Sequence, residues 1–110
     1  REIAMKIGGF DTWYTYMLDY DFWVSLACQG DVFIIHKPLN CFRVRKDSNT
    51  GQIMGGDKEK TRKYIAEHRH LVEKFKDVLS LSDSDVEKSV RIRKILNFMV
   101  RVYQLVFVHK

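Results

Sequence analysis

Two aspartates near residue 20 have the type and spacing that could carry chemistry. Asp19 and Asp21 stand two residues apart, and an aromatic pair, Phe22 and Trp23, follows them directly. A carboxylate held at the start of a helix can act as a general base that takes the proton from an attacking hydroxyl group. The alternative is structural: Asp19 caps the helix and Asp21 is a solvated carboxylate in its first turn.

A glycine pair stands about ten residues earlier. Gly8 and Gly9 are followed by Phe10 and Asp11. Because glycine has no Cβ, such a loop can bring its backbone close to a ligand. The segment up to the aspartates is aromatic and contains Trp13, Tyr14 and Tyr16. These rings could stack on a sugar ring, or they could pack within the loop.

A third block begins at Pro38-Leu39 and continues through Phe42-Arg43-Val44-Arg45. A guanidinium group can bind two phosphate oxygens at once, so Arg43 and Arg45 are candidates for a diphosphate clamp. The alternative is that both arginines are solvated on an edge strand.

The three blocks, in this order over about residues 1–50, resemble the acceptor half of a family 2 glycosyltransferase with a GT-A type fold. The resemblance implies an inverting enzyme that moves a sugar from a nucleotide-sugar donor to a hydroxyl group. The acceptor would be a glycan, a lipid-linked sugar or a cell-surface polysaccharide. The resemblance also implies that the chain is a fragment, inactive alone, because the nucleotide-binding half of such an enzyme would lie before Arg1.

The resemblance also assigns roles by position. Asp19 matches the catalytic base, while Leu18 stands where the family has a glutamate. Asp19 and Asp21 also have the Asp-x-Asp spacing of metal-dependent sugar-nucleotide enzymes, but the family's metal motif lies before the glycine block. The substrate-binding residues that the resemblance implies are Gly8, Gly9, Phe10, Asp11, Trp13, Asp21, Trp23, Arg43 and Arg45.

A divalent metal, Mg²⁺ or Mn²⁺, is the cofactor that the resemblance implies for the full-length enzyme. Arg45 takes the place of a histidine that often contributes to the metal or diphosphate site. Because arginine cannot ligate a metal, we expect no metal to bind this fragment alone.

The expected fold class is α/β and rich in helix: the C-terminal part of a GT-A type fold with one or two strands, followed by a helical hairpin. A short helix over residues 2–7 is expected to end at Gly8-Gly9, and a second to run from Tyr20 to Cys28. Val32–Ile35 is a run of β-branched and aromatic residues, and Asn40–Arg45 has partly alternating polarity, so each is predicted to be a strand. Since strands without their sheet expose unpaired edges, we also expect a homodimer or aggregation.

The second half of the chain has helical periodicity. An apolar stripe predicts a helix from about Lys58 to Leu79, with His68 packed on that face. Ser84 and Glu87 have the spacing of a capping box, which predicts a last helix from about Asp85 to Val108. The expected organisation is an acceptor-side portion at residues 1–50, a loop at 51–57 within the loop-like segment 46–57, and an antiparallel helical hairpin at 58–110.

Positive charge is concentrated in the same half, since residues 51–110 supply the whole net charge of +5. The basic residues of the last helix alternate with apolar ones: Arg91, Arg93, Lys94 and Arg101. An alternative function is therefore a non-catalytic basic helical module that binds nucleic acid, a membrane surface or a protein. Without a nucleic-acid motif we expect no nucleic acid as a partner. The expected location is the cytoplasm, with peripheral contact at the inner face of the membrane.

Overall fold

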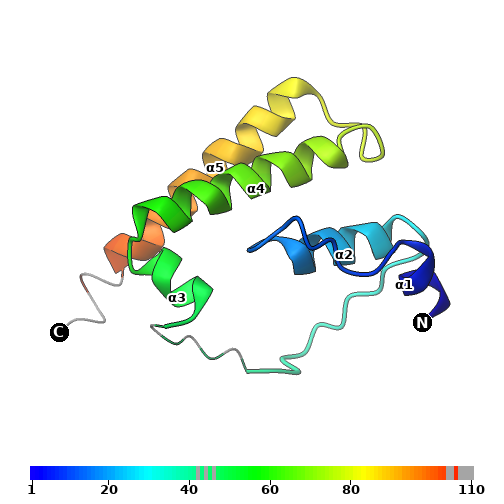
Figure 1. Ribbon diagram of the computed structural model, residues 1–110, viewed down its shortest axis with the longest axis horizontal. Helices are drawn as coiled ribbons and strands as arrows, with labels where there is room; N and C mark the ends of the chain where they lie inside the picture. Colours follow the sequence, from blue (N-terminus) through cyan, green and yellow to red (C-terminus); the bar gives the residue numbers. More distant parts are fainter. Residues whose placement is uncertain (42, 44, 46, 104–105, 107–110) are drawn as a thin grey trace. The chain divides into compact units, whose positions relative to one another are not determined.

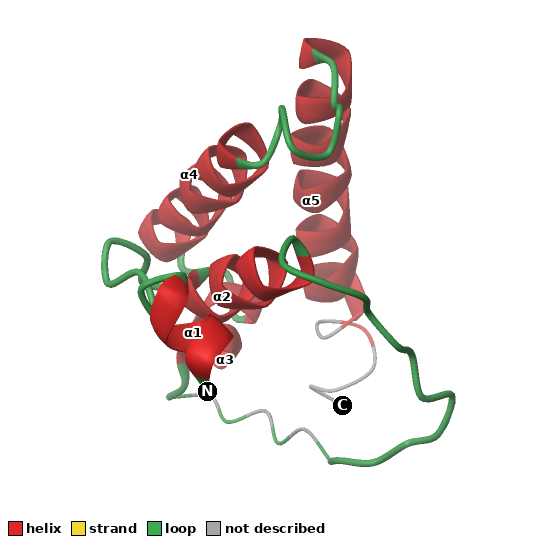
Figure 2. Ribbon diagram, turned by 90° about the vertical axis from the view of Figure 1, so that its right-hand side faces the viewer, coloured by secondary structure: helices red, strands yellow, loops and turns green. Residues whose placement is uncertain are grey.

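The computed structural model describes residues 1–41, 43, 45, 47–103 and 106. The chain divides into two compact units, Arg1–Arg43 and Val44–Lys110. The described residues form α-helices joined by turns and irregular segments, with no strand among them (Figures 1 and 2).

The predicted α/β fold class is wrong for this structure. Val32–Ile35, a predicted strand, is an irregular segment in which every side chain is at least 65% exposed. A strand is stabilised by hydrogen bonds to a neighbouring strand and by packing of one face, and neither is present around this segment in the described residues. Of the second predicted strand, Asn40–Arg45, the described residues are also irregular, while Phe42 and Val44 lie outside the described residues.

The first unit begins with a short helix that ends where the sequence predicts. Helix α1 spans Glu2–Lys6. Gly8 and Gly9 follow it with φ angles of 85° and 71°, in the left-handed region that glycine enters without strain. Their N–H groups donate to the carbonyl groups of the last helical turn. The glycine pair therefore stops the helix and turns the chain.

The second helix of this unit, α2, spans Leu18–Ala27. It begins two residues earlier than the predicted Tyr20, and its N-cap is Met17, which makes no side-chain capping bond. Met17 is fully buried, and Tyr14 and Asp21 are buried as well. Burial of Met17 fixes the start of α2, so Asp19 lies inside the first turn rather than at the cap.

The second unit contains three helices, each with its own start. Helix α3 spans Asn49–Met54, inside a segment that the sequence predicts to be a loop. The hydroxyl oxygen of Ser48 caps it by accepting from Gly51 N at 3.1 Å. Helix α4 spans Lys58–Lys74, and the carboxylate of Asp57 caps it by accepting from Lys60 N at 3.0 Å.

Helix α5 spans Asp83–Tyr103 and lies side by side with α4 (Figure 1). Arg69 reaches Glu87, and Arg101 near the end of α5 reaches Thr61 near the start of α4, so the helices are antiparallel as predicted. The core of the unit is apolar and consists of Ile53, Leu71, Phe75, Val86 and Val90.

The capping box of α5 lies two residues before the predicted one. Ser82 Oγ accepts from Asp85 N at 3.2 Å, and Asp85 Oδ2 accepts from Ser82 N at 2.9 Å. Glu87, the predicted partner of Ser84, instead pairs with Arg69 across the helix pair. The predicted end of the helix, near Val108, lies outside the described residues. No helix that the structure describes is both long and apolar enough to cross a bilayer.

Candidate functional site

Asp19 lies on an exposed face of α2 together with two aromatic rings. Tyr20 is 49% exposed and Trp23 is 64% exposed. Asp19 and Trp23 are four residues apart and Tyr20 and Trp23 three apart, so their side chains leave the helix in similar directions. Asp19 Oδ1 accepts from Tyr20 N at 2.9 Å, which leaves the outer part of the carboxylate to solvent. A carboxylate beside exposed aromatic faces is an arrangement that suits a sugar hydroxyl group.

Asp21 has a different environment although it stands only two residues away. Asp21 is only 3% exposed. Two residues along a helix correspond to a rotation of about 200°, so Asp19 and Asp21 point to opposite sides. The two carboxylates therefore cannot hold one metal ion, and substrate binding by Asp21 stays a prediction for a buried residue.

The glycine block meets α2 through an aromatic stack. The rings of Phe10 and Phe22 lie 4.3 Å apart, centroid to centroid, with 27° between their planes. Phe22 in turn makes an edge contact with Trp23 at 5.4 Å. The turn at Gly8-Gly9 delivers Phe10 to this stack, so the structure brings the glycine block and the exposed face of α2 together.

Asp11 and Trp13 lie in the loop between α1 and α2. Asp11 Oδ1 accepts from Trp13 N at 3.0 Å, an Asx-type turn that shapes the loop. Trp13 is 58% exposed and makes an edge contact with Tyr14, whose ring is buried. Asp11 is therefore engaged by its own loop, while Trp13 adds another exposed aromatic surface to the first unit.

The two arginines of the third block are separated between the units. Arg43 is exposed at the end of the first unit, and Arg45 belongs to the second. Arg45 Nε donates to Asp47 Oδ1 at 3.0 Å, and this pairing lowers the pKa of the Asp47 carboxyl group. A diphosphate clamp by Arg43 or Arg45 stays a prediction, and Arg45 would have to give up its bonds to Asp47 to serve as one.

The described residues contain no group of three or more His, Cys, Asp or Glu side chains that could hold a metal ion. The described residues therefore show no site for the divalent metal that the resemblance implies.

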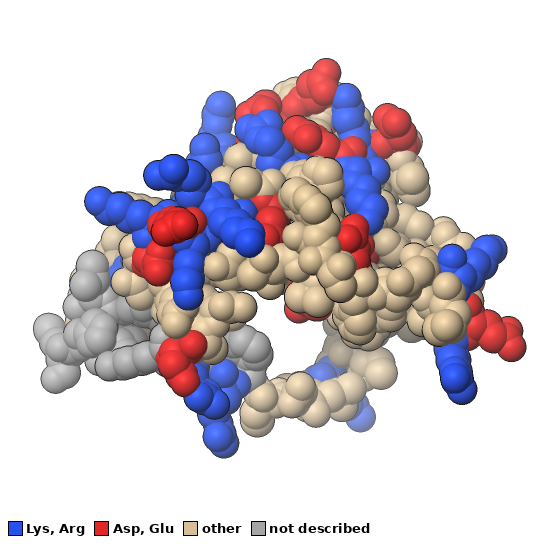
Figure 3. Space-filling model, in the orientation of Figure 1, with Lys and Arg blue, Asp and Glu red and all other residues tan. Residues whose placement is uncertain are grey.

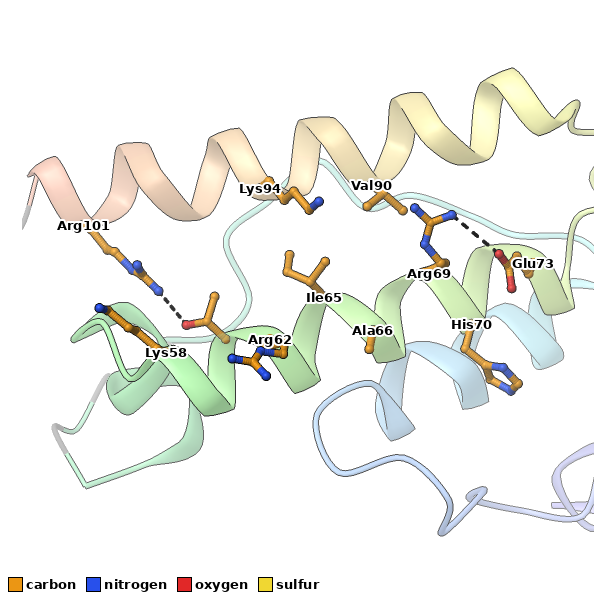
Figure 4. Close-up of a pocket in the computed structure, with 11 residues that line it drawn as sticks. Lys58, Arg62, Ile65, Ala66, Arg69, His70, Glu73, Val90, Lys94 and Arg101 are labelled. Carbon is orange, nitrogen blue, oxygen red and sulfur yellow. Dashed lines mark hydrogen bonds and ion pairs between the residues drawn. The ribbon is translucent and has the colours of Figure 1, made fainter.

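The second unit contains a basic groove that the sequence did not predict. It lies between α4 and α5, has a volume of about 560 Å³, and has one carboxylate in its lining, Glu73. Figure 3 shows Lys and Arg side chains gathered over the start of α4. In Figure 4, Lys94 and Arg101 extend from α5 toward α4, with Ile65 and Val90 between the helices. The basic residues of the lining are Lys58, Arg62, Arg69, His70, Lys94 and Arg101.

His68 is, with Glu67, one of two buried titratable residues of α4. It is 6% exposed, as the sequence predicts for a packed residue, and its Nε2 lies 3.1 Å from Ser89 Oγ. Burial first, and then the positive charge of Arg93, lowers the pKa of His68 below its ordinary value. Its Nδ1 has no hydrogen-bond partner among the described residues, so no third group orients the ring as in a catalytic triad. The contact is therefore a packing feature of the helix pair.

Comparisons of the chain with protein-family models, with curated proteins and with solved structures gave no match.

Proposed function

We propose that the first unit is the acceptor-binding part of an inverting glycosyltransferase and that Asp19 is its general base. The observation that carries the proposal is the exposed face of α2, where the exposed Asp19 precedes the exposed ring of Trp23 by four residues, about one helical turn. The resemblance of the three sequence blocks supports the same assignment. The proposal assigns none of the described residues to the donor-binding part of such an enzyme.

In the proposed reaction, the acceptor sugar stacks on the exposed aromatic rings and its hydroxyl group approaches Asp19. As the hydroxyl oxygen attacks the anomeric carbon of the donor, the Asp19 carboxylate takes the proton. The new bond joins the acceptor oxygen to the anomeric carbon, and the bond to the nucleotide diphosphate breaks. Attack from the side opposite the leaving group inverts the anomeric configuration.

The binding step can be tested on the 110-residue chain by following its amide and tryptophan indole resonances during titration with a panel of glycans. We expect saturable shifts at Tyr20 and Trp23. Trp23→Ala should weaken binding about tenfold, because truncating an aromatic anchor commonly costs more than 1 kcal/mol of binding free energy. Phe33→Ala is the matched control, since Phe33 is 90% exposed in the same unit but lies outside α2. Equal losses in both variants, or no saturable shift with any glycan, would overturn acceptor binding by this face.

The catalytic step is tested in the sugar-transferring protein that contains this segment. Asp19→Asn keeps the shape of the side chain but removes its ability to take a proton. We expect glycan binding to stay within about twofold, while nucleotide release falls by about a hundredfold or more. Nucleotide release that survives the substitution would remove Asp19 from the role of base and leave the binding proposal standing.

A further inference from the structure

The groove between α4 and α5 is large enough to be a ligand site. Its volume of about 560 Å³ lies within the range of small-molecule pockets, about 300–1,000 Å³. All of its lining comes from the second unit, so the site does not depend on sugar binding by the first.

The described lining of the groove has more basic than acidic side chains. Arg69 is paired with Glu87 and Glu73. In contrast, Lys58 and Arg62 form no ion pair with any residue that the structure describes. One end of the groove is therefore paired with carboxylates. At the other end, near the start of α4, the lining has Lys58, Arg62 and Arg101 and no carboxylate, while Asp57 and Glu59 lie in the same turn outside the lining.

Arg101 is held in place at the positive end. One of its terminal nitrogens donates to Thr61 Oγ1 at 2.6 Å, and Thr61 Oγ1 in turn donates to the Asp57 carbonyl oxygen at 2.6 Å. A guanidinium group has five N–H donors, and one hydrogen bond leaves most of them unused by the described residues. Because the side chain is already anchored on α4, it loses little freedom when an anion binds.

The middle of the groove is apolar. Ile65 and Val90 lie between the helices, and Ala66 adds a small exposed surface (Figure 4). A fully polar anion would leave this part empty. The lining therefore matches a ligand that has a phosphate group at one end and an apolar group at the other.

We propose that this groove binds an organic phosphate, with the phosphoryl oxygens at Lys58, Arg62 and Arg101 and the apolar group over Ile65 and Ala66. The phosphate could come from a soluble phosphate ester or from the headgroup of an anionic lipid. Arg62 and Arg101 can each form two parallel bonds to phosphate oxygens, which lysine cannot.

Isothermal titration of the 110-residue chain tests the site with inorganic phosphate, butyl phosphate and phosphatidylcholine vesicles that contain phosphatidic acid. If the apolar part of the groove takes the butyl group, butyl phosphate should bind about tenfold more tightly than inorganic phosphate. Arg62→Gln should weaken butyl phosphate binding by about fivefold or more, since one charge-assisted contact is lost. Arg62 is exposed and forms no ion pair with a described residue, so this variant should fold as the wild type does.

Arg91→Gln is the matched control, because Arg91 is an exposed arginine of α5 that does not line the groove. Its binding should stay within about twofold of the wild type. Equal weakening by Arg62→Gln and Arg91→Gln would overturn the site in favour of general charge attraction, and so would the absence of saturable binding to all three probes. Butyl phosphate binding without vesicle binding would support the site with a soluble ester as its ligand. Vesicle binding that Arg62→Gln reduces would support it with a lipid headgroup.

Discussion

Acidification should lower the free energy of unfolding of the second unit, because it protonates His68. The ring is buried between α4 and α5 and lies beside Arg93, so its protonation puts a second positive charge into a place with little water. The pKa of His68 is lowered in the folded chain, which means that the unfolded chain binds the proton more tightly. Stability from the neutral ring is therefore fully present above the unfolded pKa of 6.5 and is lost as pH falls through the folded pKa.

The size of the effect follows from proton linkage. Between the two pKa values the unfolded state holds up to one more proton than the folded state at this site. The free energy of unfolding then changes by at most about 1.4 kcal/mol per pH unit. The carboxyl groups of Asp85 and Glu87 have lowered pKa values, so their contributions begin to be lost at lower pH than the start of the His68 window.

The assay is urea unfolding at a series of pH values from 7.5 to 4.5, for the wild type and for His68→Gln. Glutamine can keep a hydrogen bond to Ser89 Oγ but does not titrate. We expect the difference in unfolding free energy between the two proteins to be constant above pH 6.5 and to shift against the wild type below it. A difference that does not change with pH would refute the assignment of the buried, neutral ring as the cause.

Two further predictions concern the same unit. Leu71→Ala should lower the free energy of unfolding by about 2–5 kcal/mol, because Leu71 is 7% exposed in a small core, and urea unfolding measures this directly. Asp57→Ala should cost about 1 kcal/mol and reduce amide protection in the first turn of α4, since it removes the acceptor for Lys60 N; a change confined to α5 would contradict this.

The helices that the sequence predicted correctly are those whose cause is local. The glycine pair ends α1 because its conformation depends on Gly8 and Gly9 alone. The apolar periodicity likewise predicted the positions of α4 and α5 but not the end of α4, which stops at Lys74 rather than near Leu79, with Val78 and Leu79 exposed. The prediction of a strand at Val32–Ile35 was wrong because a strand needs a neighbouring strand to pair with, and the local sequence does not show whether one is present. The observed start of α2 differs from the predicted start for a similar reason. Met17 is buried, and the helix begins before the predicted Tyr20.

Two capping boxes compete at the start of α5, and local sequence does not separate them. Ser82 with Asp85 and Ser84 with Glu87 both have the required spacing. The structure uses the earlier pair, which leaves Glu87 to accept from Arg69 of α4. The two capping boxes are thus equivalent in local sequence, and what distinguishes them is the contact of Glu87 with Arg69 on the neighbouring helix.

The candidate sites show the same division between local and distant causes. The resemblance assigned different roles to Asp19 and Asp21, but the sequence did not show that Asp19 is exposed and Asp21 buried. The basic groove did have a sequence signal. Arg62 and Arg69 are seven residues apart, as are Lys94 and Arg101, so each pair lies on one stripe of its helix. The sequence alone did not show that the basic stripes of α4 and α5 line the same groove.

The positions of basic and apolar residues around α5 bear on the predicted membrane contact. Lys94 and Arg101 lie within about 40° of Val90, on the side that faces α4, whereas Met99 lies about 180° away on the outer side. Met99 is 59% exposed and Ile95, its neighbour on that side, is 50% exposed. The groove therefore accounts for Lys94 and Arg101, and a membrane contact would depend on the outer apolar side. Vesicle binding that Met99→Ser removes and Arg62→Gln leaves intact would assign that contact to the outer side and separate it from the phosphate site.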